Sequence, residues 1–174
     1  QPEFTQIDME MSFVNEDDVI EIIEELIIKI FKEIKGISLS SGFKRISYQE
    51  SMDRFGNDRP DLRFGLELQT ITDIFKNTDF KVFKGVIESE GVIKCIKVKD
   101  ATMTRNNIDE LTFFAQEQGA KGLAWIKVLD SELQSPILKF FSEEEISSLK
   151  SQLKLKVGDI IFFGAGDEEV VNNY

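Results

Sequence analysis

The most regularly spaced polar side chains lie near the amino terminus. Gln6, Asp8 and Glu10 occupy every second position there, and the residues between them are apolar. Successive side chains of an extended strand point to opposite faces, so this spacing predicts a strand over 6–13 with one amide and two carboxylates in a row. Such a row could line a polar pocket, or it could face solvent, which is the commonest reason for the pattern. Periodicity alone favours the solvated face.

Several kinds of chemistry are excluded by composition. The chain has no histidine, and Cys95 is its only cysteine. It therefore cannot supply a His-dependent triad, a His-ligated metal, an internal disulfide or a Cys-x-x-Cys metal site. Cys95 stands between Ile93 and Ile96, which favours an inert buried thiol over a nucleophile. We assign no catalytic residue and no metal ligand to this chain.

Three further patterns have simple structural explanations. Gly164-Ala165-Gly166 follows an apolar stretch, but it lacks the remaining residues of a dinucleotide fingerprint or a P-loop, so we predict a turn. Trp125 lies in an apolar run and is predicted to be a core residue rather than a base-stacking platform. Six basic residues could form a patch, although the acids between them favour a mixed-charge surface. They are Lys94, Lys97, Lys99, Arg105, Lys121 and Lys127.

Charge and hydropathy limit the partners. The 174 residues carry 32 acidic and 21 basic side chains, a net charge of −11, which argues against non-specific binding of DNA or RNA but allows a local RNA contact. The most apolar stretch, 19–34, is interrupted by six charged residues and is too polar to span a membrane. Without disulfides or a targeting signal, a cytoplasmic protein is predicted. The chain begins with Gln1 rather than Met, and we expect it to be a piece of a longer protein.

The first part of the chain predicts two capped helices. Asn15 and Gly36 bound the first, which ends at Lys35 and carries an apolar stripe that predicts packing against a core. A short strand is expected at 43–46. The second helix begins after Ser47 in a capping-box pattern and ends before Gly56. A polar turn follows, and we place a domain boundary within 64–72.

The remainder predicts a small α+β unit with one mostly antiparallel sheet and helices on a single face. Capping residues mark the helix starts, and apolar runs mark the strands. In order, the expected elements are strands at 80–88 and 92–98, a helix from Thr104 to Gln118, a strand at 122–128, a helix from Ser142 to Leu153, a strand at 159–163 and a helix from Asp167.

Four segments, in order, resemble the bacterial type of aspartyl-tRNA synthetase, a class II synthetase family. Residues 1–13, QPEFTQIDMEMSF, resemble the second half of motif 2. Residues 48–63, YQESMDRFGNDRPDLR, are similar to the region that reads YGSDKPDLR in that family. Residues 119–128, GAKGLAWIKV, and 158–164, GDIIFFG, resemble landmarks of the insertion domain between motifs 2 and 3. Together these segments span essentially the whole chain.

The resemblance implies a domain division. Residues 1–70 would belong to the class II catalytic domain and carry part of its antiparallel sheet. Residues 71–174 would form the smaller insertion domain, of the GAD type, which is shared with an amidotransferase B subunit. The alternative reading is therefore a tRNA-binding module of an amidotransferase B-type subunit, without synthetase activity. The motif 2-like segment ahead of the insertion argues against that alternative.

The resemblance also implies a chemistry. The family joins aspartate to ATP, which forms aspartyl-adenylate, and passes the aspartyl group to tRNA(Asp). Mg²⁺ would offset the negative charge of the phosphates, and the enzyme would be active as a homodimer. By resemblance Gln1 would contact ATP, and Gln6, Asp8 and Glu10 would line the aspartate pocket, because the substrate ammonium needs negatively charged acceptors. This reverses the preference stated above and favours the pocket. Motifs 1 and 3 and the motif 2 arginine are not in this chain, so we expect it to be inactive alone.

Overall fold

A computed structural model of the chain describes residues 2–130 and 132–174. The chain divides into two compact units, Gln1–Arg45 and Ile46–Tyr174. The domain boundary expected near residue 70 from the resemblance stays a prediction. The described elements are the helices α1 (Glu16–Lys35), α2 (Tyr48–Phe55), α3 (Lys81–Glu88), α4 (Arg105–Glu117), α5 (Glu143–Leu153) and α6 (Glu168–Asn173), and the strands β1 (Gln69–Thr70), β2 (Val92–Val98), β3 (Ala124–Val128), β4 (Leu133–Gln134) and β5 (Ile160–Gly166).

The first unit is built on α1, which confirms the predicted helix. The Asn15 side chain accepts hydrogen bonds from the backbone N–H groups of Asp17 (3.0 Å) and Asp18 (3.4 Å), and the Asp18 carboxylate accepts from the Asn15 N–H (2.9 Å). This reciprocal cap satisfies donors that have no partner inside a helix. Gly36 ends α1 with a left-handed backbone, φ 67°, a conformation that costs glycine little.

Two predicted strands in this region are wrong. Residues 2–11 and 43–47 have no regular secondary structure. An extended segment becomes a strand only by exchanging backbone hydrogen bonds with a neighbour, and no described strand pairs with either segment. Among the described residues, β1 is the only strand within 1–70, and it pairs with β2 of the second unit. The part of a catalytic sheet expected there is not seen in residues 2–70.

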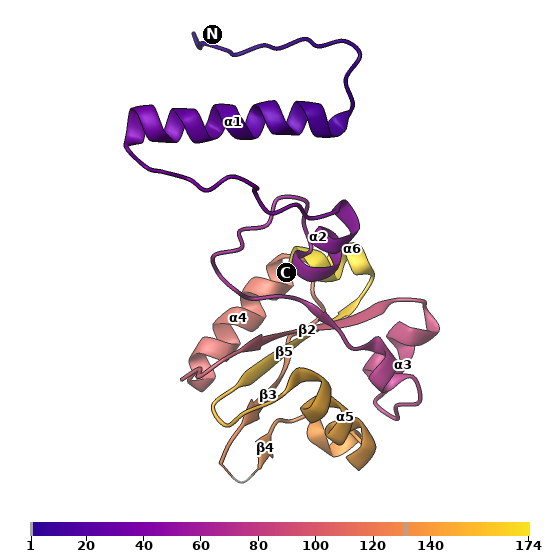
Figure 1. The fold of residues 1–174 in the computed structure, drawn as a ribbon. Coiled ribbons are helices and arrows are strands. Elements are labelled where there is room, and N and C mark those ends of the chain that lie inside the picture. The colour runs from indigo at the N-terminus through magenta and orange to yellow at the C-terminus, as the bar shows by residue number, and fades with distance from the viewer. Residues whose placement is uncertain (1, 131) are drawn as a thin grey trace. The chain divides into compact units, whose positions relative to one another are not determined.

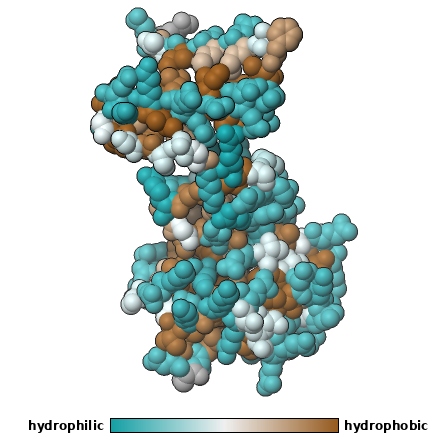
Figure 2. Space-filling model, in the orientation of Figure 1, coloured by the Kyte–Doolittle hydropathy of each residue, from teal (hydrophilic) through white to brown (hydrophobic). Residues whose placement is uncertain are grey.

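The apolar stripe of α1 is not packed into a core. No residue of α1 is buried, and Ile34 is 73% exposed. Figure 2 shows hydrophobic side chains at the surface of this unit. The predicted core-packing role of α1 is therefore not seen within this unit. Among the described residues, no helix is long and apolar enough to cross a membrane.

The second unit is built on one open sheet with the strand order β1-β2-β5-β3-β4 (Figure 1). Every neighbouring pair is antiparallel. The central pair is the longest, with Val92 opposite Gly166 and Val98 opposite Ile160. The predicted α+β class with an antiparallel sheet is confirmed.

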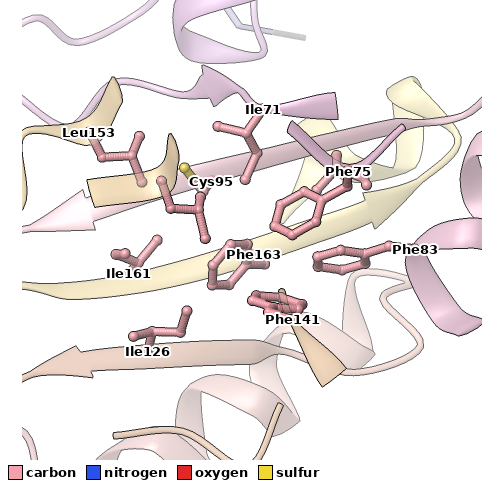
Figure 3. Close-up of a cluster of buried hydrophobic side chains, with 11 residues drawn as sticks. Ile71, Phe75, Phe83, Cys95, Ile126, Phe141, Leu153, Ile161 and Phe163 are labelled. Atoms are coloured by element: carbon pink, nitrogen blue, oxygen red, sulfur yellow. The ribbon is translucent and has the colours of Figure 1, made fainter. Parts of the chain in front are cut away.

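Helices cover both faces of this sheet, rather than the single face expected. Along β5, Ile161 and Phe163 belong to one buried cluster, and Ile160 and Phe162 belong to another. The first cluster packs under α3, α5 and a 3₁₀ helix, Thr72–Phe75, and its aromatic centre is shown in Figure 3. The second packs under α4 through Ile108. A strand that is apolar on both faces needs cover on both, and β5 is such a strand.

Two further expectations about the second unit are wrong. The strand expected at 80–88 is instead helix α3, Lys81–Glu88, with Phe80 as its N-cap, and the apolar residues Phe80, Phe83 and Ile87 follow the helical spacing. Gly164, Ala165 and Gly166 continue β5 instead of forming a turn. Small residues are needed there because α6 lies close to the sheet, and a Cβ added at Gly164 would stand 2.9 Å from Val171 Cγ1. The other predicted helices and strands of this unit are present.

Candidate functional site

The structure leaves the predicted aspartate-binding side chains unengaged. Gln6, Asp8 and Glu10 are exposed and lie in a segment without regular secondary structure. No described residue makes a hydrogen bond to their side chains. Gln1, expected at the ATP site, lies outside the described residues. The assignment of these four residues stays a prediction.

A cavity in the first unit lies beside α1. It has a volume of about 320 Å³ and lies between the apolar side of α1 and the segment 43–45. Arg45 fixes that segment by pairing with Asp17 (3.3 Å) and Glu24 (3.5 Å). The surface of its wall is mostly apolar, so this cavity offers packing and little chemistry.

The segment resembling YGSDKPDLR folds as α2 and a loop held by local polar contacts. The Ser51 hydroxyl donates to the Asn57 carbonyl oxygen at 2.7 Å. The side chain of Arg54 pairs with the carboxylates of Glu50 and Glu67, which raises the pKa of Arg54. Hydrogen bonds from Arg63 lower the pKa of Asp61 to about 2. These contacts fix the shape of the loop and keep its charged groups ionised.

The loop after α2 and helix α6 meet over the second face of the sheet. A Cβ added at Gly56 would lie 2.8 Å from the Asn172 carbonyl oxygen, so glycine is needed for this approach. Lys94 of β2 is only 2% exposed, and its ammonium lies 2.8 Å from the Glu168 carboxylate and 2.9 Å from the Asn172 amide oxygen. Both partners of this buried ammonium belong to α6, so Lys94 holds α6 against the sheet and has a structural role.

Among the described residues, the structure shows a buried thiol and no metal-binding cluster. Cys95 is 1% exposed, and burial raises the pKa of its thiol to about 12, which confirms the predicted inert role. Among residues 2–130 and 132–174, no group of three or more Cys, Asp or Glu side chains could hold a metal ion. The described residues therefore offer no site for the Mg²⁺ that the resemblance implies.

A cavity in the second unit brings together residues that are distant in sequence. It lies between the first turn of α4 and the β3–β4 pair and has a volume of about 360 Å³. Trp125 and Lys127 alternate on β3 and so share one face of the sheet. Gln134 of β4 is directly opposite Lys127. The residues that line the cavity include Arg105, Ile108, Trp125, Lys127, Gln134 and Ser135.

The six basic residues that could have formed a patch do not gather in one place, which agrees with the mixed-charge surface that the sequence favoured. Lys94 is buried, and the Lys97 ammonium donates to the Leu153 carbonyl oxygen at 2.6 Å, on the face covered by α5. Of the six residues, only Arg105 and Lys127 line the cavity beside α4. Trp125 is partly buried against the second cluster, as predicted, but it also lines this cavity. The only sequence signal was the Trp-x-Lys spacing on a strand, since Arg105 lies 20 positions earlier.

Comparison with known proteins gives a consistent result. Residues 83–174 match the model of the GAD domain. The chain is 56% identical over 171 residues to an aspartate–tRNA(Asp/Asn) ligase of Aquifex aeolicus (strain VF5), covering 98% of this chain and 28% of that protein. A Hydrogenobaculum protein (strain Y04AAS1) of the same name is 55% identical, covering 95% and 28%. An aspartate–tRNA ligase of Clostridium botulinum (strain Kyoto / Type A2) is 49% identical, covering 98% and 29%.

The chain thus spans less than a third of the length of these relatives. The matched region extends well ahead of residue 83, because it covers nearly the whole chain. These similarities confirm the resemblance to the synthetase family that the four sequence segments suggested.

Proposed function

The chain belongs to the GAD domain family, and we propose that the protein of which it is a segment is an aspartate–tRNA ligase. The single observation that carries this proposal is the 56% identity to the Aquifex ligase over 98% of the chain. An amidotransferase B-type subunit would share the GAD domain, but the similarity here also includes residues before 83. That extent favours the ligase.

The proposed reaction has two steps. A carboxylate oxygen of aspartate attacks the α-phosphorus of ATP, which forms aspartyl-adenylate and releases pyrophosphate. A hydroxyl at the 3′ end of the tRNA then attacks the adenylate carbonyl and releases AMP. The protein positions the reactants and stabilises charge rather than forming a covalent intermediate of its own. The substrates would therefore be aspartate, ATP and tRNA(Asp), and relatives named for tRNA(Asp/Asn) make tRNA(Asn) a second substrate to test.

We assign the binding of the substrate ammonium to Asp8, supported by Gln6 and Glu10, and a contact with ATP to Gln1. Support comes from the resemblance of residues 1–13 to motif 2. An ammonium group is held best by charge-assisted hydrogen bonds to such acceptors. Mg²⁺ would accompany ATP, but the described residues fit no metal and we assign it no ligand.

The remaining parts of the proposal concern the whole protein. Residues 1–70 would belong to its catalytic domain and residues 71–174 to its insertion domain. The protein would act as a homodimer in the cytoplasm, without a membrane or DNA partner. These features rest on the family resemblance and on the acidic net charge of −11.

The test is exchange of labelled pyrophosphate into ATP by the purified full-length protein. The proposal predicts exchange that depends on L-aspartate and is much weaker with L-glutamate or L-asparagine. Charging of tRNA(Asp) with labelled aspartate should follow in the same preparation. A folded full-length protein that shows no aspartate-dependent exchange would contradict the proposal.

A further inference from the structure

The cavity between α4 and the β3–β4 pair combines features that suit one class of ligand. We infer that it binds an unpaired nucleotide of RNA, with the base against Trp125 and the phosphate near Arg105 and Lys127. The inference rests on the proposed function for its partner, since a tRNA is the RNA that a ligase of this kind would hold.

The cavity carries a local positive charge in an acidic chain. Its two ionisable lining residues, Arg105 and Lys127, are both cations, whereas the chain has a net charge of −11. The Arg105 side chain is 80% exposed and lies 3.5 Å from the Asp109 carboxylate. An exposed ion pair of that length contributes little, so the guanidinium can turn to a phosphate. Local cations within an acidic surface select an anionic ligand at this position.

The cavity also offers a flat ring. Trp125 is partly buried and lines the cavity. The Lys127 ammonium lies over its ring, 5.6 Å from the centroid, so a base would contact the part of the ring that Lys127 leaves uncovered. Single-stranded RNA is typically held by bases stacked on aromatic side chains while Arg or Lys contacts the backbone. The Gln134 side chain, directly opposite Lys127, adds a donor and an acceptor for a base edge.

The site is held in shape by the fold. The Lys127 ammonium donates to the Met103 carbonyl oxygen at 2.7 Å, which ties β3 to the start of α4. The Ser135 hydroxyl donates to the Trp125 carbonyl oxygen, which fixes the segment after β4. Ile108, 1% exposed, forms the floor. A volume of about 360 Å³ is at the lower end of small-molecule sites and suits one nucleotide.

The test compares two charge reversals in the full-length protein. Arg105 is the first residue of α4, and Lys81 is the first residue of α3, on the other face of the sheet. A glutamate at the start of a helix is favourable, so neither Arg105→Glu nor Lys81→Glu should impair folding. We expect Arg105→Glu to weaken tRNA binding about tenfold and to reduce its salt dependence by roughly one phosphate contact, while Lys81→Glu changes affinity less than twofold.

A second pair of variants tests the ring. Trp125→Phe keeps a stacking surface and Trp125→Leu removes it, while both remain apolar enough for the core. We expect Trp125→Leu to weaken tRNA binding several-fold more than Trp125→Phe, and circular dichroism checks that both variants fold. Equal effects of the two would contradict stacking on Trp125.

The alternatives give different results. Equal tRNA affinity of Arg105→Glu and Lys81→Glu would overturn the inference. The inference would also be overturned if Arg105→Glu weakened the binding of free AMP but left the affinity for tRNA unchanged. Aspartate-dependent pyrophosphate exchange without tRNA should be unchanged in both variants. If the unmodified protein showed no aspartate-dependent pyrophosphate exchange, the proposed function would be contradicted. The tRNA affinities of the two variants would still test the RNA-binding cavity.

Discussion

Individual glycines show how closely the parts of the second unit approach one another. At Gly164 an added Cβ would stand 2.9 Å from Val171 and 3.1 Å from the Tyr174 hydroxyl oxygen. At Gly85, within α3, an added Cβ would meet nothing within 4 Å. The same substitution should therefore have opposite effects at these two positions, because one is a contact surface and the other is an open helix position.

We predict that Gly164→Ala lowers the free energy of unfolding by about 1–3 kcal/mol, because α6 must shift away from β5. Gly85→Ala should raise it by up to about 1 kcal/mol, because alanine favours the helix. Urea unfolding of the two variants and the parent protein measures both. If Gly164→Ala were as stable as the parent, the close approach of α6 would be wrong.

Cys95 provides a pH-dependent prediction. Burial raises the pKa of its thiol from 9.0 to about 12, so the folded protein favours the protonated form. The free energy of unfolding is therefore unaffected by ionisation of Cys95 below pH 9 and falls as the pH rises from 9 towards 12. In that range the thiol ionises in the unfolded chain but stays protonated in the folded chain. At pH 8 we expect iodoacetamide to modify Cys95 at least about a hundredfold more slowly in native protein than in urea-unfolded protein. Mass spectrometry of the peptide that carries Cys95 measures this, and similar rates in the two states would contradict its burial.

At the scale of elements, helix starts carry local signals that are strong enough to read from sequence. In α5 the Ser142 hydroxyl accepts from the Glu145 N–H at 3.2 Å, and the buried Glu145 carboxylate accepts from the Ser142 N–H at 2.7 Å. Both halves of this capping box lie within four residues, so the sequence alone specifies them.

We predict that Ser142→Ala destabilises the protein by about 1 kcal/mol, because the N–H of Glu145 loses its partner. Ser147, exposed on the same helix, supplies the matched control. Ser147→Ala should be neutral or slightly stabilising, since alanine is the better helix former. Thermal unfolding distinguishes the two, and equal stability of both variants would show that the cap contributes nothing.

The sequence predicts local features better than it predicts those that depend on distant residues. The caps at Asn15, Thr104 and Ser142 and the long strand β2 were predicted from neighbours in the chain. The apolar content of residues 80–88 favours a strand, whereas the structure follows the helical spacing of Phe80, Phe83 and Ile87. The cavity beside α4 could not be predicted, because Arg105 and Trp125 meet only through packing of α4 on the sheet.

At the scale of the whole molecule, the two units differ in how much apolar surface they bury. The second unit has two buried clusters, while no residue of α1 is buried. Local stability follows burial, so the units should open with different free energies. Exposure of the α1 stripe is what we expect of a segment that packs against other parts of a larger protein.

We predict that, in the 174-residue chain, amide hydrogens of β2 and β5 exchange far more slowly than those of α1. Backbone hydrogen bonds in β2 and β5 lie between two buried clusters, whereas those of α1 are reachable by water. Hydrogen exchange followed by mass spectrometry tests this prediction. Equal protection of α1 and β5 would mean that the first unit buries more than the structure shows.

The most direct measurement is the rate of aspartate-dependent pyrophosphate exchange by the full-length protein carrying Asp8→Asn. Asp17→Asn, an exposed carboxylate in the first turn of α1, is the matched control. If Asp8 holds the substrate ammonium, Asp8→Asn should lower the exchange rate at least about a hundredfold, because a charge-assisted contact is lost, while tRNA affinity stays within twofold. Exchange by Asp8→Asn at the rate of Asp17→Asn would contradict the proposed aspartate site.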